Sequence, residues 1–235
     1  MPVIDLHTHV LWELDDGADS FETTTQMLAR MHASGITHIA CTPHADPGYR
    51  PFDNQTYFQK LSEAQDWANH ALPGLRLLSG CEISWTYHTV EALRQKQVPT
   101  LNGTHYALIE FPASISVYEL KSALSKLSSI GITPVIAHAE RISALLWQPK
   151  KALRLKDEMP FLYQLNAQTL LQKSGPVMKH FLNVMLKERA IDILSSDAHN
   201  LSSRPPVLAE ARAVLSALTD PAYADKATGF TGVIK

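Results

Sequence analysis

The sequence predicts one α/β domain whose parallel sheet closes, or nearly closes, into a barrel. Short apolar runs rich in β-branched residues alternate with helix-like patterns, as is typical of parallel strands joined by crossover helices. There are seven such runs, and 235 residues with 45% hydrophobic side chains are enough to bury the core of one barrel. An open doubly wound sheet has the same alternation and stays open as the alternative.

The predicted elements follow in a regular order. The strands are VIDL (3–6), ITHIAC (36–41), LRLLSG (75–80), YALIEF (106–111), TPVIA (133–137), FLYQLN (161–166) and IDILSS (191–196). Helices are expected between them, most clearly over residues 20–35 and between Ser116, a suitable N-cap, and Gly131. One face of the second helix carries Val117, Leu120, Leu124, Leu127 and Ile130. The weakly patterned residues 219–235 are expected to form a partly flexible tail of the single domain 1–235.

Composition and charge exclude several classes of protein. The formal net charge is −2, and Lys and Arg are spread along the chain without a basic track, so nucleic acid is not an expected partner. Cys41 and Cys81 are the only cysteines, which is too few for a disulfide framework. The sequence has no signal-peptide pattern and no apolar run near the roughly 20 residues that cross a bilayer. We therefore expect a cytoplasmic protein that does not insert into a membrane.

Histidine or acidic residues follow six of the seven runs. His7 and His9 come directly after the first run, and side chains two residues apart on a strand share a face. Asp197 and His199 repeat that spacing after the last run. The runs between them lead to His44, Glu82, Glu110 and His138. Because the carboxyl ends of parallel strands meet at one edge, these side chains are expected to lie together.

Such a cluster is typical of a multinuclear metal site. A single histidine after a strand is more often a hydrogen-bonded structural residue, but many carboxylates and imidazoles gathered at one edge are costly to desolvate unless cations neutralise them. Nitrogen and oxygen ligands suit Mn²⁺, Fe²⁺ or Zn²⁺. Asp16, in LDDGA, is a further candidate ligand, although Asp-Gly is common turn chemistry and Asp15 could equally take that place.

The motifs together resemble a known superfamily. In chain order they are HTH, DDGA, TPH, a strand ending at Glu82, LIEFP, AHAER and SDAHN. This set resembles the polymerase and histidinol phosphatase (PHP) superfamily over residues 3–215, and within it the bacterial manganese-dependent protein-tyrosine phosphatases of capsule and exopolysaccharide biosynthesis. The resemblance implies a distorted seven-stranded, TIM-like (βα)7 barrel with three divalent metal ions, expected to be Mn²⁺, with Fe and Zn as alternatives.

The resemblance also implies roles for individual residues. One metal ion would be held by His7, His9, Glu82 and Asp197, a second by Glu82, Glu110 and His138, and a third by Asp16, His44 and His199. Arg141 and Arg204 match the two functionally important arginines of that branch, and their planar guanidinium groups suit phosphate. The chain departs from the usual pattern at Ala139, where proline is common, and without the proline ring the segment that orients Arg141 is expected to be less rigid.

The expected activity is that of a metal-dependent phosphomonoesterase, a protein-tyrosine phosphatase in which metal-activated hydroxide attacks phosphorus. The resemblance implies as partner the tyrosine-rich tail of a membrane-bound bacterial tyrosine autokinase that controls polysaccharide export. The alternatives are a small-molecule phosphatase, such as one for histidinol phosphate, and a metal-binding regulatory module with low turnover. A PHP-type nuclease is less favoured because the basic track is missing. A thiolate phosphatase needs an arginine six residues after its cysteine, where this chain has Pro47 and Tyr87.

Overall fold

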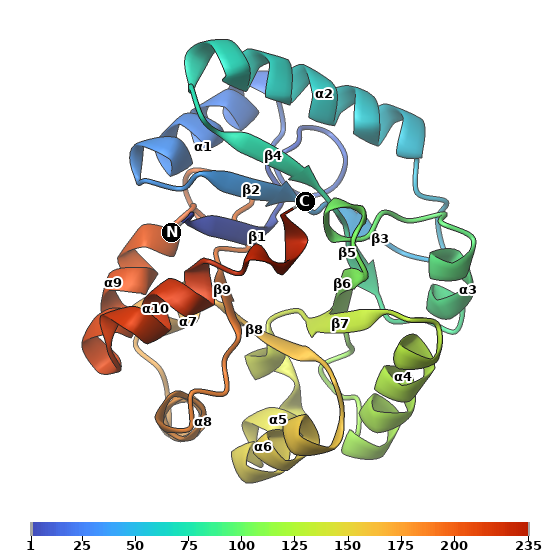
Figure 1. Cartoon of the computed structure of the whole chain (residues 1–235), viewed down its shortest axis with the longest axis vertical. Helices are drawn as coiled ribbons and strands as arrows, with labels where there is room; N and C mark the ends of the chain where they lie inside the picture. The colour runs from blue at the N-terminus through green and yellow to red at the C-terminus, as the bar shows by residue number, and fades with distance from the viewer. Residues whose placement is uncertain (1, 235) are drawn as a thin grey trace.

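The computed structural model describes residues 2–234 and contains strands enclosed by helices (Figure 1). The strands are β1 (Ile4–Thr8), β2 (His38–Cys41), β3 (His44–Ala45), β4 (Arg76–Ser79), β5 (Glu82–Ser84), β6 (Tyr106–Glu110), β7 (Thr133–Ile136), β8 (Leu162–Asn166) and β9 (Ile193–Ser195). The α-helices are α1 (Phe21–Ala33), α2 (Asn54–Ala71), α3 (Thr89–Arg94), α4 (Val117–Ser129), α5 (Ser143–Leu146), α6 (Pro149–Glu158), α7 (Ala167–Leu171), α8 (Pro176–Lys187), α9 (Leu208–Leu218) and α10 (Pro221–Thr228). Short 3₁₀ helices are η1 (Leu101–Gly103), η2 (Ala139–Arg141) and η3 (Thr231–Val233).

The strands form a curled, fully parallel arrangement in two sheets. The first has the order β1-β2-β4 and the second β3-β5-β6-β7-β8-β9. The last strand returns to the first, because the His9 N–H donates to the Ala198 carbonyl and the Asp197 N–H donates to the His7 carbonyl, both at 2.8 Å. The α/β class and the parallel direction of the strands are therefore as predicted.

The number of strands differs from the expected seven. Each predicted run contains a strand, but the part of the chain that the structure describes has nine, because β3 and β5 were not predicted. They follow β2 and β4 after interruptions at Thr42-Pro43 and Gly80-Cys81. Pro43 has no N–H to donate to a neighbouring strand, which explains the first interruption. Both breaks lie directly before candidate site residues, His44 and Glu82.

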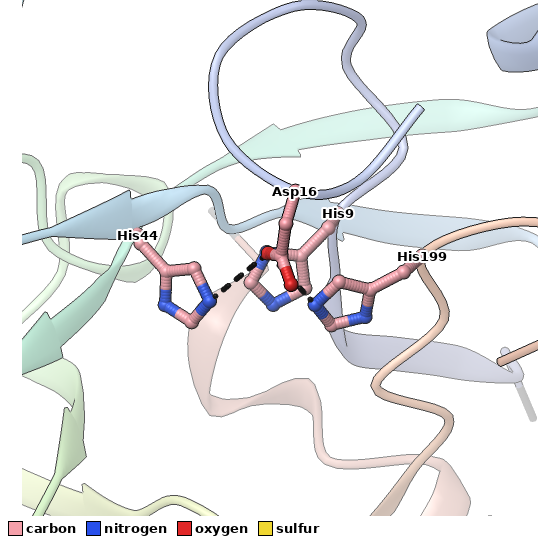
Figure 2. A group of neighbouring side chains, drawn as sticks. All are labelled: His9, Asp16, His44 and His199. Carbon is pink, nitrogen blue, oxygen red and sulfur yellow. Dashed lines mark ion pairs between the residues drawn. The ribbon is translucent and has the colours of Figure 1, made fainter. Parts of the chain in front are cut away.

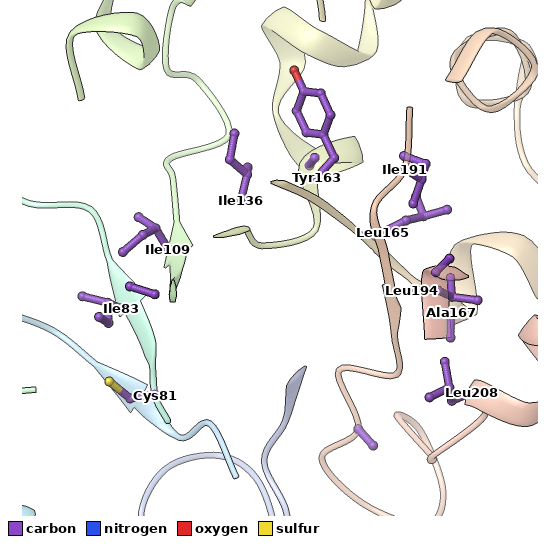
Figure 3. Packing of buried hydrophobic residues seen from close by; sticks show 14 of the residues in the cluster. Cys81, Ile83, Ile109, Ile136, Tyr163, Leu165, Ala167, Ile191, Leu194 and Leu208 are labelled. Carbon is purple, nitrogen blue, oxygen red and sulfur yellow. The ribbon is translucent and has the colours of Figure 1, made fainter. Parts of the chain in front are cut away.

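Two hydrophobic clusters fix which way the strands face. Ile39, Ile109 and Ile136 belong to the larger cluster, which lies between the strands and the outer helices; Figure 3 shows the corresponding side chains of neighbouring strands. Their neighbours Ala40 and Leu108 belong to a smaller cluster inside the curl. Because both faces of the strands are buried, the strands read as continuous apolar runs, and the polar residues are confined to their ends.

The predicted helices α1 and α4 form with the expected caps. The Ser20 hydroxyl accepts a hydrogen bond from the Thr23 N–H at the start of α1. Ser116 and Glu119 form a reciprocal capping box at the start of α4, which satisfies two backbone donors that the helix leaves unpaired. The buried side of α4 contains Leu120, Leu124 and Leu127, so the predicted core face is confirmed.

The C-terminal segment is helical, unlike the weakly patterned tail that the sequence predicts. The Asp220 side chain accepts from the Tyr223 N–H and starts α10. Val233 is fully buried in the inner cluster, and its carbonyl accepts a 2.8 Å hydrogen bond from Asn102 Nδ2. The described segment after α10, red in Figure 1, lies near the middle of the ring of strands. Among the described residues, no helix has the length and apolar character needed to cross a membrane.

Candidate metal centre

The structure brings the nine predicted metal ligands to the carboxyl ends of the strands. This is the edge at which barrels and open α/β sheets place their ligand sites. His7 lies on β1, His44 on β3, Glu82 on β5 and Glu110 on β6. His9, Asp16, His138, Asp197 and His199 lie in the segments that follow β1, β7 and β9.

The first group consists of four buried side chains. His7 Nε2 lies 3.2 Å from Glu82 Oε2 and 3.3 Å from Asp197 Oδ1. His9 Nε2 lies 3.3 and 3.5 Å from the same two oxygens, and 3.3 Å from His7 Nε2. Four ligands placed tetrahedrally at about 2.1 Å from one cation are about 3.4 Å apart. These four atoms therefore have the spacing that a single bound metal ion requires.

A second group surrounds the exposed carboxylate of Asp16. Asp16 Oδ1 lies 3.3 Å from His44 Nε2 and 3.4 Å from His199 Nε2, and Figure 2 shows it between the two rings with His9 close by. The Nε2 atom of His199 is buried and has no hydrogen-bond partner. A buried polar atom without a partner is costly, and a cation beside Asp16 would satisfy it.

The third group is arranged around the Glu82 carboxylate. His138 Nε2 lies 2.8 Å from Glu82 Oε1 and 3.5 Å from Glu110 Oε1. The other oxygen of Glu82 lies 3.0 Å from His44 Nδ1. The ligand atoms of His44, Glu82 and Glu110 also lie close enough together to hold one ion. Glu82 therefore faces the first group through one oxygen and the third group through the other.

Hydrogen bonds from Nδ1 fix the ring orientation of three histidines. His9 Nδ1 donates to Asp15 Oδ2 at 2.6 Å, His7 Nδ1 donates to Gln164 Oε1 at 3.2 Å, and His199 Nδ1 donates to the Asp197 carbonyl at 2.8 Å. Protonation at Nδ1 leaves a lone pair on Nε2, and metal-binding histidines in proteins are commonly held in this way. The donor set and its supports therefore fit divalent cations.

The choice between the two neighbouring aspartates is settled by their contacts. Asp15 is largely buried and binds His9 together with the backbone N–H groups of Gly17 and His44. Asp16 is exposed and faces His44 and His199. Asp16 is thus the candidate ligand, and Asp15 positions His9.

Two supporting residues were not predicted from the sequence. Gln164 accepts from His7 Nδ1 and from the His138 N–H, and its own amide donates to Asn166. Asn166 Nδ2 donates to Asp197 Oδ2 at 2.7 Å. Both lie on β8, the run FLYQLN that lacks an acidic or histidine ending. Two buried amides in an otherwise apolar strand were the signal that could have identified them.

The backbone is shaped to hold these side chains. His138 has φ of 30° and Asp197 has φ of 54°, left-handed conformations that are costly for residues other than glycine and that concentrate at functional sites. A Cβ at Gly17 would lie 2.2 Å from the His9 carbonyl oxygen. The glycine of DDGA therefore permits the loop to pass close behind His9.

The electrostatics favour an ionised Glu82, whereas burial and the nearby Glu82 raise the pKa of Glu110. Burial opposes the charge on Glu82, but the facing His7 ring and hydrogen bonds from His138 and His44 hold its pKa well below the usual value. Burial likewise opposes the charge on His9, yet Asp15, Asp197 and Glu82 raise its pKa well above 6.5, so a cation bound at Nε2 would displace a proton. Burial and the nearby His9 lower the pKa of His199 to about 4, so that ring is neutral at pH 7 and can offer a lone pair to a cation.

Both predicted arginines lie at the rim. Arg141 Nη2 donates to Asp197 Oδ2 at 3.0 Å, and Arg204 Nη2 donates to Asp16 Oδ2 at 2.6 Å. The backbone carbonyl of Arg204 also accepts from the His199 N–H at 2.9 Å. A guanidinium group has five N–H donors, so one such contact leaves donors available for a phosphate. The two arginines thus border the cluster while remaining partly exposed.

The cluster opens to solvent through a wide, shallow depression of about 770 Å³. Its lining is mainly polar and includes Glu13, Leu14, Asp15, Asp16, His44, Asp46, Arg50, Ser84 and Glu110. Cys41 and Cys81 are fully buried away from this opening, and burial raises the pKa of the Cys81 thiol well above its usual value. Neither cysteine has the character of a nucleophile.

Comparison with known proteins agrees with the motifs. The capsular polysaccharide synthesis family CpsB/CapC matches residues 3–229. The tyrosine-protein phosphatase CpsB of Streptococcus agalactiae is 33% identical over 218 residues, which cover 91% of this chain and 89% of that protein. The tyrosine-protein phosphatase YwqE of Bacillus subtilis is 31% identical over 206 residues, covering 86% of this chain and 79% of that protein.

Solved structures agree as well. A chain from the structures of YwqE from Bacillus subtilis and CpsB from Streptococcus pneumoniae, described as metal-dependent tyrosine phosphatases, matches with a TM-score of 0.81, 28% identity and coverage of 91% of this chain and 86% of that one. Histidinol phosphate phosphatase from Lactococcus lactis shares the fold alone, with a TM-score of 0.59, 15% identity and coverage of 93% and 94%. The resemblance predicted from the sequence is confirmed, and the chain belongs to the CpsB/CapC family of capsular polysaccharide synthesis proteins.

Proposed function

We propose that this chain is a metal-dependent protein-tyrosine phosphatase, a phosphomonoesterase that hydrolyses phosphotyrosine. The observation that carries the proposal is the joint presence of three metal-ligand groups and two arginines paired with ligand carboxylates, where Asp16, His44 and Glu110 line an open depression. The relatives at 31–33% identity are named tyrosine-protein phosphatases, and they are matched over most of their length. The capsule association of the family is consistent with a role in capsular or exopolysaccharide biosynthesis.

The three groups are proposed to hold three divalent ions. The ligands would be His7, His9, Glu82 and Asp197 for the first, Glu82, Glu110 and His138 for the second, and Asp16, His44 and His199 for the third. Their nitrogen and oxygen atoms favour Mn²⁺, with Fe and Zn as alternatives. When bound, such ions supply activated water near neutral pH and stabilise charge on phosphoryl oxygens. The curled sheet around them is proposed to be a distorted seven-stranded barrel, in which β2 continues into β3 and β4 into β5.

Arg141 and Arg204 are proposed to bind the phosphate. Each is already held near the cluster by one carboxylate contact, so little side-chain freedom is lost when a phosphoryl oxygen binds. Planar guanidinium donors aimed at these oxygens stabilise the charge that spreads over them in the transition state. The leaving phenolate, with a pKa of about 10, needs less protonation than an alkoxide. Because metal-activated water would attack phosphorus, the chain needs no protein nucleophile.

The shape of the opening supports a polypeptide substrate. A shallow depression bordered by exposed side chains can admit a phosphotyrosine that projects from a flexible segment, whereas a small metabolite is better held by an enclosing pocket. We propose the tyrosine-rich tail of a membrane-bound tyrosine autokinase as the partner. A cytoplasmic location is proposed because both cysteines are unpaired.

The test is a comparison of phosphate release from a phosphotyrosine peptide, a phosphoserine peptide and histidinol phosphate, each with Mn²⁺ and with EDTA. We expect Mn²⁺-dependent release chiefly from the phosphotyrosine peptide. A preference for histidinol phosphate would support the proposed metal site but would contradict phosphotyrosine as the substrate. Binding of the phosphopeptide without release from any substrate would instead favour a regulatory module.

A further inference from the structure

Helix α6 (Pro149–Glu158) presents an exposed basic surface. Lys150, Lys151 and Arg154 are all exposed. A groove of about 430 Å³ between α4 and α6 is lined by Lys121, Lys151, Arg154 and the single acidic residue Glu158, together with Val117, Tyr118 and Leu155. Glu158 is already engaged by Lys121. The groove therefore has a surplus of positive charge on a chain whose overall charge is −2.

The charges in the first turn of α6 oppose the helix dipole. Lys150 and Lys151 lie in its first turn, which contains no acidic residue, and Gln148 makes no side-chain capping bond. The amino end of a helix carries partial positive charge, so lysines there lower helix stability. In contrast, α4 begins with the capping box of Ser116 and Glu119. The lysines of α6 thus do not serve the helix itself, whereas an anion bound at this end would be stabilised by both the lysines and the dipole.

Neighbouring lining residues mark a course from the metal centre to this groove. Ser84 and Glu110 line the central depression. The next residue, Trp85, donates its N–H to the Glu110 carbonyl at 2.8 Å and lines a second depression of about 390 Å³, whose lining includes Tyr118. Tyr118 is 83% exposed and also lines the α4–α6 groove. Exposed aromatic side chains of this kind are common where a partner binds.

We propose that the α4–α6 groove binds an acidic segment of the substrate polypeptide that flanks the phosphotyrosine in the metal centre. The segment would follow the course past Trp85 and Tyr118, and its carboxylates or a second phosphate group would pair with Lys150, Lys151 and Arg154. This inference rests on the proposed phosphatase function and names a surface that sets substrate preference. Charged contacts at the edge of a binding site mainly raise the association rate and the selectivity between substrates.

The experiment compares kcat/KM for phosphotyrosine peptides of equal length. One peptide has neutral flanks. Two others carry a pair of aspartates, one peptide before the phosphotyrosine and one after it, and a further two carry a second phosphotyrosine at these same places. In the unaltered protein we expect an acidic flank on one side to raise kcat/KM roughly tenfold at low salt and less at high salt. A triple variant, Lys150→Gln, Lys151→Gln and Arg154→Gln, should reduce the ratio of acidic to neutral peptide towards one. The aspartate and phosphate peptides distinguish the two sources of negative charge.

A matched control removes three exposed cations from the opposite end of the strands, Arg30→Gln, Arg76→Gln and Lys187→Gln. It makes the same change in net charge and should leave the ratio unchanged. A ratio of one in the unaltered protein, or an equal fall in both triple variants, would overturn the proposal. So would loss of binding to anionic phosphatidylserine vesicles in the α6 variant with no change in the peptide ratio.

A binding measurement separates this proposal from the proposed function. Fluorescence anisotropy with peptides that carry a non-hydrolysable phosphonate analogue of phosphotyrosine needs no turnover. Tighter binding of the acidic analogue, lost in the α6 variant, supports the groove even where no peptide releases phosphate, in which case only the phosphatase function fails. Phosphate release with equal binding of acidic and neutral analogues would retain the phosphatase and reject the groove.

Discussion

Neighbouring residues in LDDGA divide into two roles that their order alone could not assign. Asp15 is buried behind His9, and Asp16 faces His44 and His199 from the solvent side. Both are acidic and both precede the same glycine, so only the turn geometry decides which carboxylate faces the cluster. Eight of the nine candidate ligands were predicted from strand endings and Asp16 from the family resemblance, whereas Asp15 and Gln164 depend on side-chain contacts across the fold.

Removing the charge behind His9 should weaken metal binding. Asp15→Asn keeps the size of the side chain but loses the carboxylate, whose pKa is lowered to about 2 against the effect of burial by its contact with His9. We expect Mn²⁺ affinity to fall about 10- to 100-fold, as for other residues that orient metal ligands. Calorimetric titration with Mn²⁺ measures this. The exposed Asp19→Asn serves as the control, and equal affinities of the two variants would contradict the positioning role.

A substitution at Arg204 tests its proposed role in binding the phosphate. Arg204→Lys keeps the positive charge near Asp16 but loses the planar donor fork. We expect kcat/KM for a phosphotyrosine peptide to fall roughly 100-fold, the scale of losing a preorganised donor to transition-state charge. The same replacement at Arg189, which pairs with Asp220 on the outer surface, should change little. Turnover by Arg204→Lys within twofold of the unaltered protein would remove this residue from the proposed mechanism.

Strands and their connecting loops show how far an element can be predicted. The seven apolar runs predict the strands, and Ser116 predicts the start of α4. The short strands β3 and β5 were missed because single interruptions at Pro43 and Gly80 divide the ladders, and periodicity does not register a two-residue break. The positive φ angles of His138 and Asp197 are also invisible to pattern, since only tertiary contacts hold them there.

The loop behind β1 depends on a single glycine. A Cβ added by Gly17→Ala would lie 2.2 Å from the His9 carbonyl oxygen and 2.6 Å from His9 Cβ, so the loop must move and displace His9. We expect a loss of more than about 2 kcal/mol in the free energy of unfolding, with weaker Mn²⁺ binding, measured by urea denaturation and metal titration. Gly175→Ala, where an added Cβ meets nothing within 4 Å, should cost less than about 1 kcal/mol, because the poorer N-cap is partly offset by the lower entropy of the unfolded chain. Similar losses in both would refute this reading.

At the scale of the whole molecule, the C-terminal segment fills the apolar interior of the curled sheet. Val233 packs with residues of β1, β2 and β6 in the inner cluster, although the sequence around it lacks a clear period. Its burial follows from the shape of the curled sheet, which leaves an apolar interior for the tail to fill. That consequence of closure could not be predicted from local pattern, because only the assembled strands create the interior.

A charge at this position should therefore unfold the protein more easily. Val233→Asp places a carboxylate in an apolar interior, and we expect the free energy of unfolding to fall by about 3 kcal/mol or more. Thr231→Asp, at an exposed position of the same 3₁₀ helix, is the matched control and should be close to neutral. Thermal and urea denaturation measure both. Equal midpoints for the two variants would show that the tail contributes little to stability.

The hydrogen bonds that join the segment after β9 to β1 have a consequence for biosynthesis. His7 and His9 are far from Asp197 and His199 in the sequence, and the nearby bond from the Leu6 N–H to Ser195 Oγ spans 189 residues. Contacts this distant in sequence form late because the intervening chain must be ordered first. The first group is thus complete only after residues 195–199 have been synthesised and have joined β1, so binding of a metal ion there and closure of the sheet would be the same late step of folding.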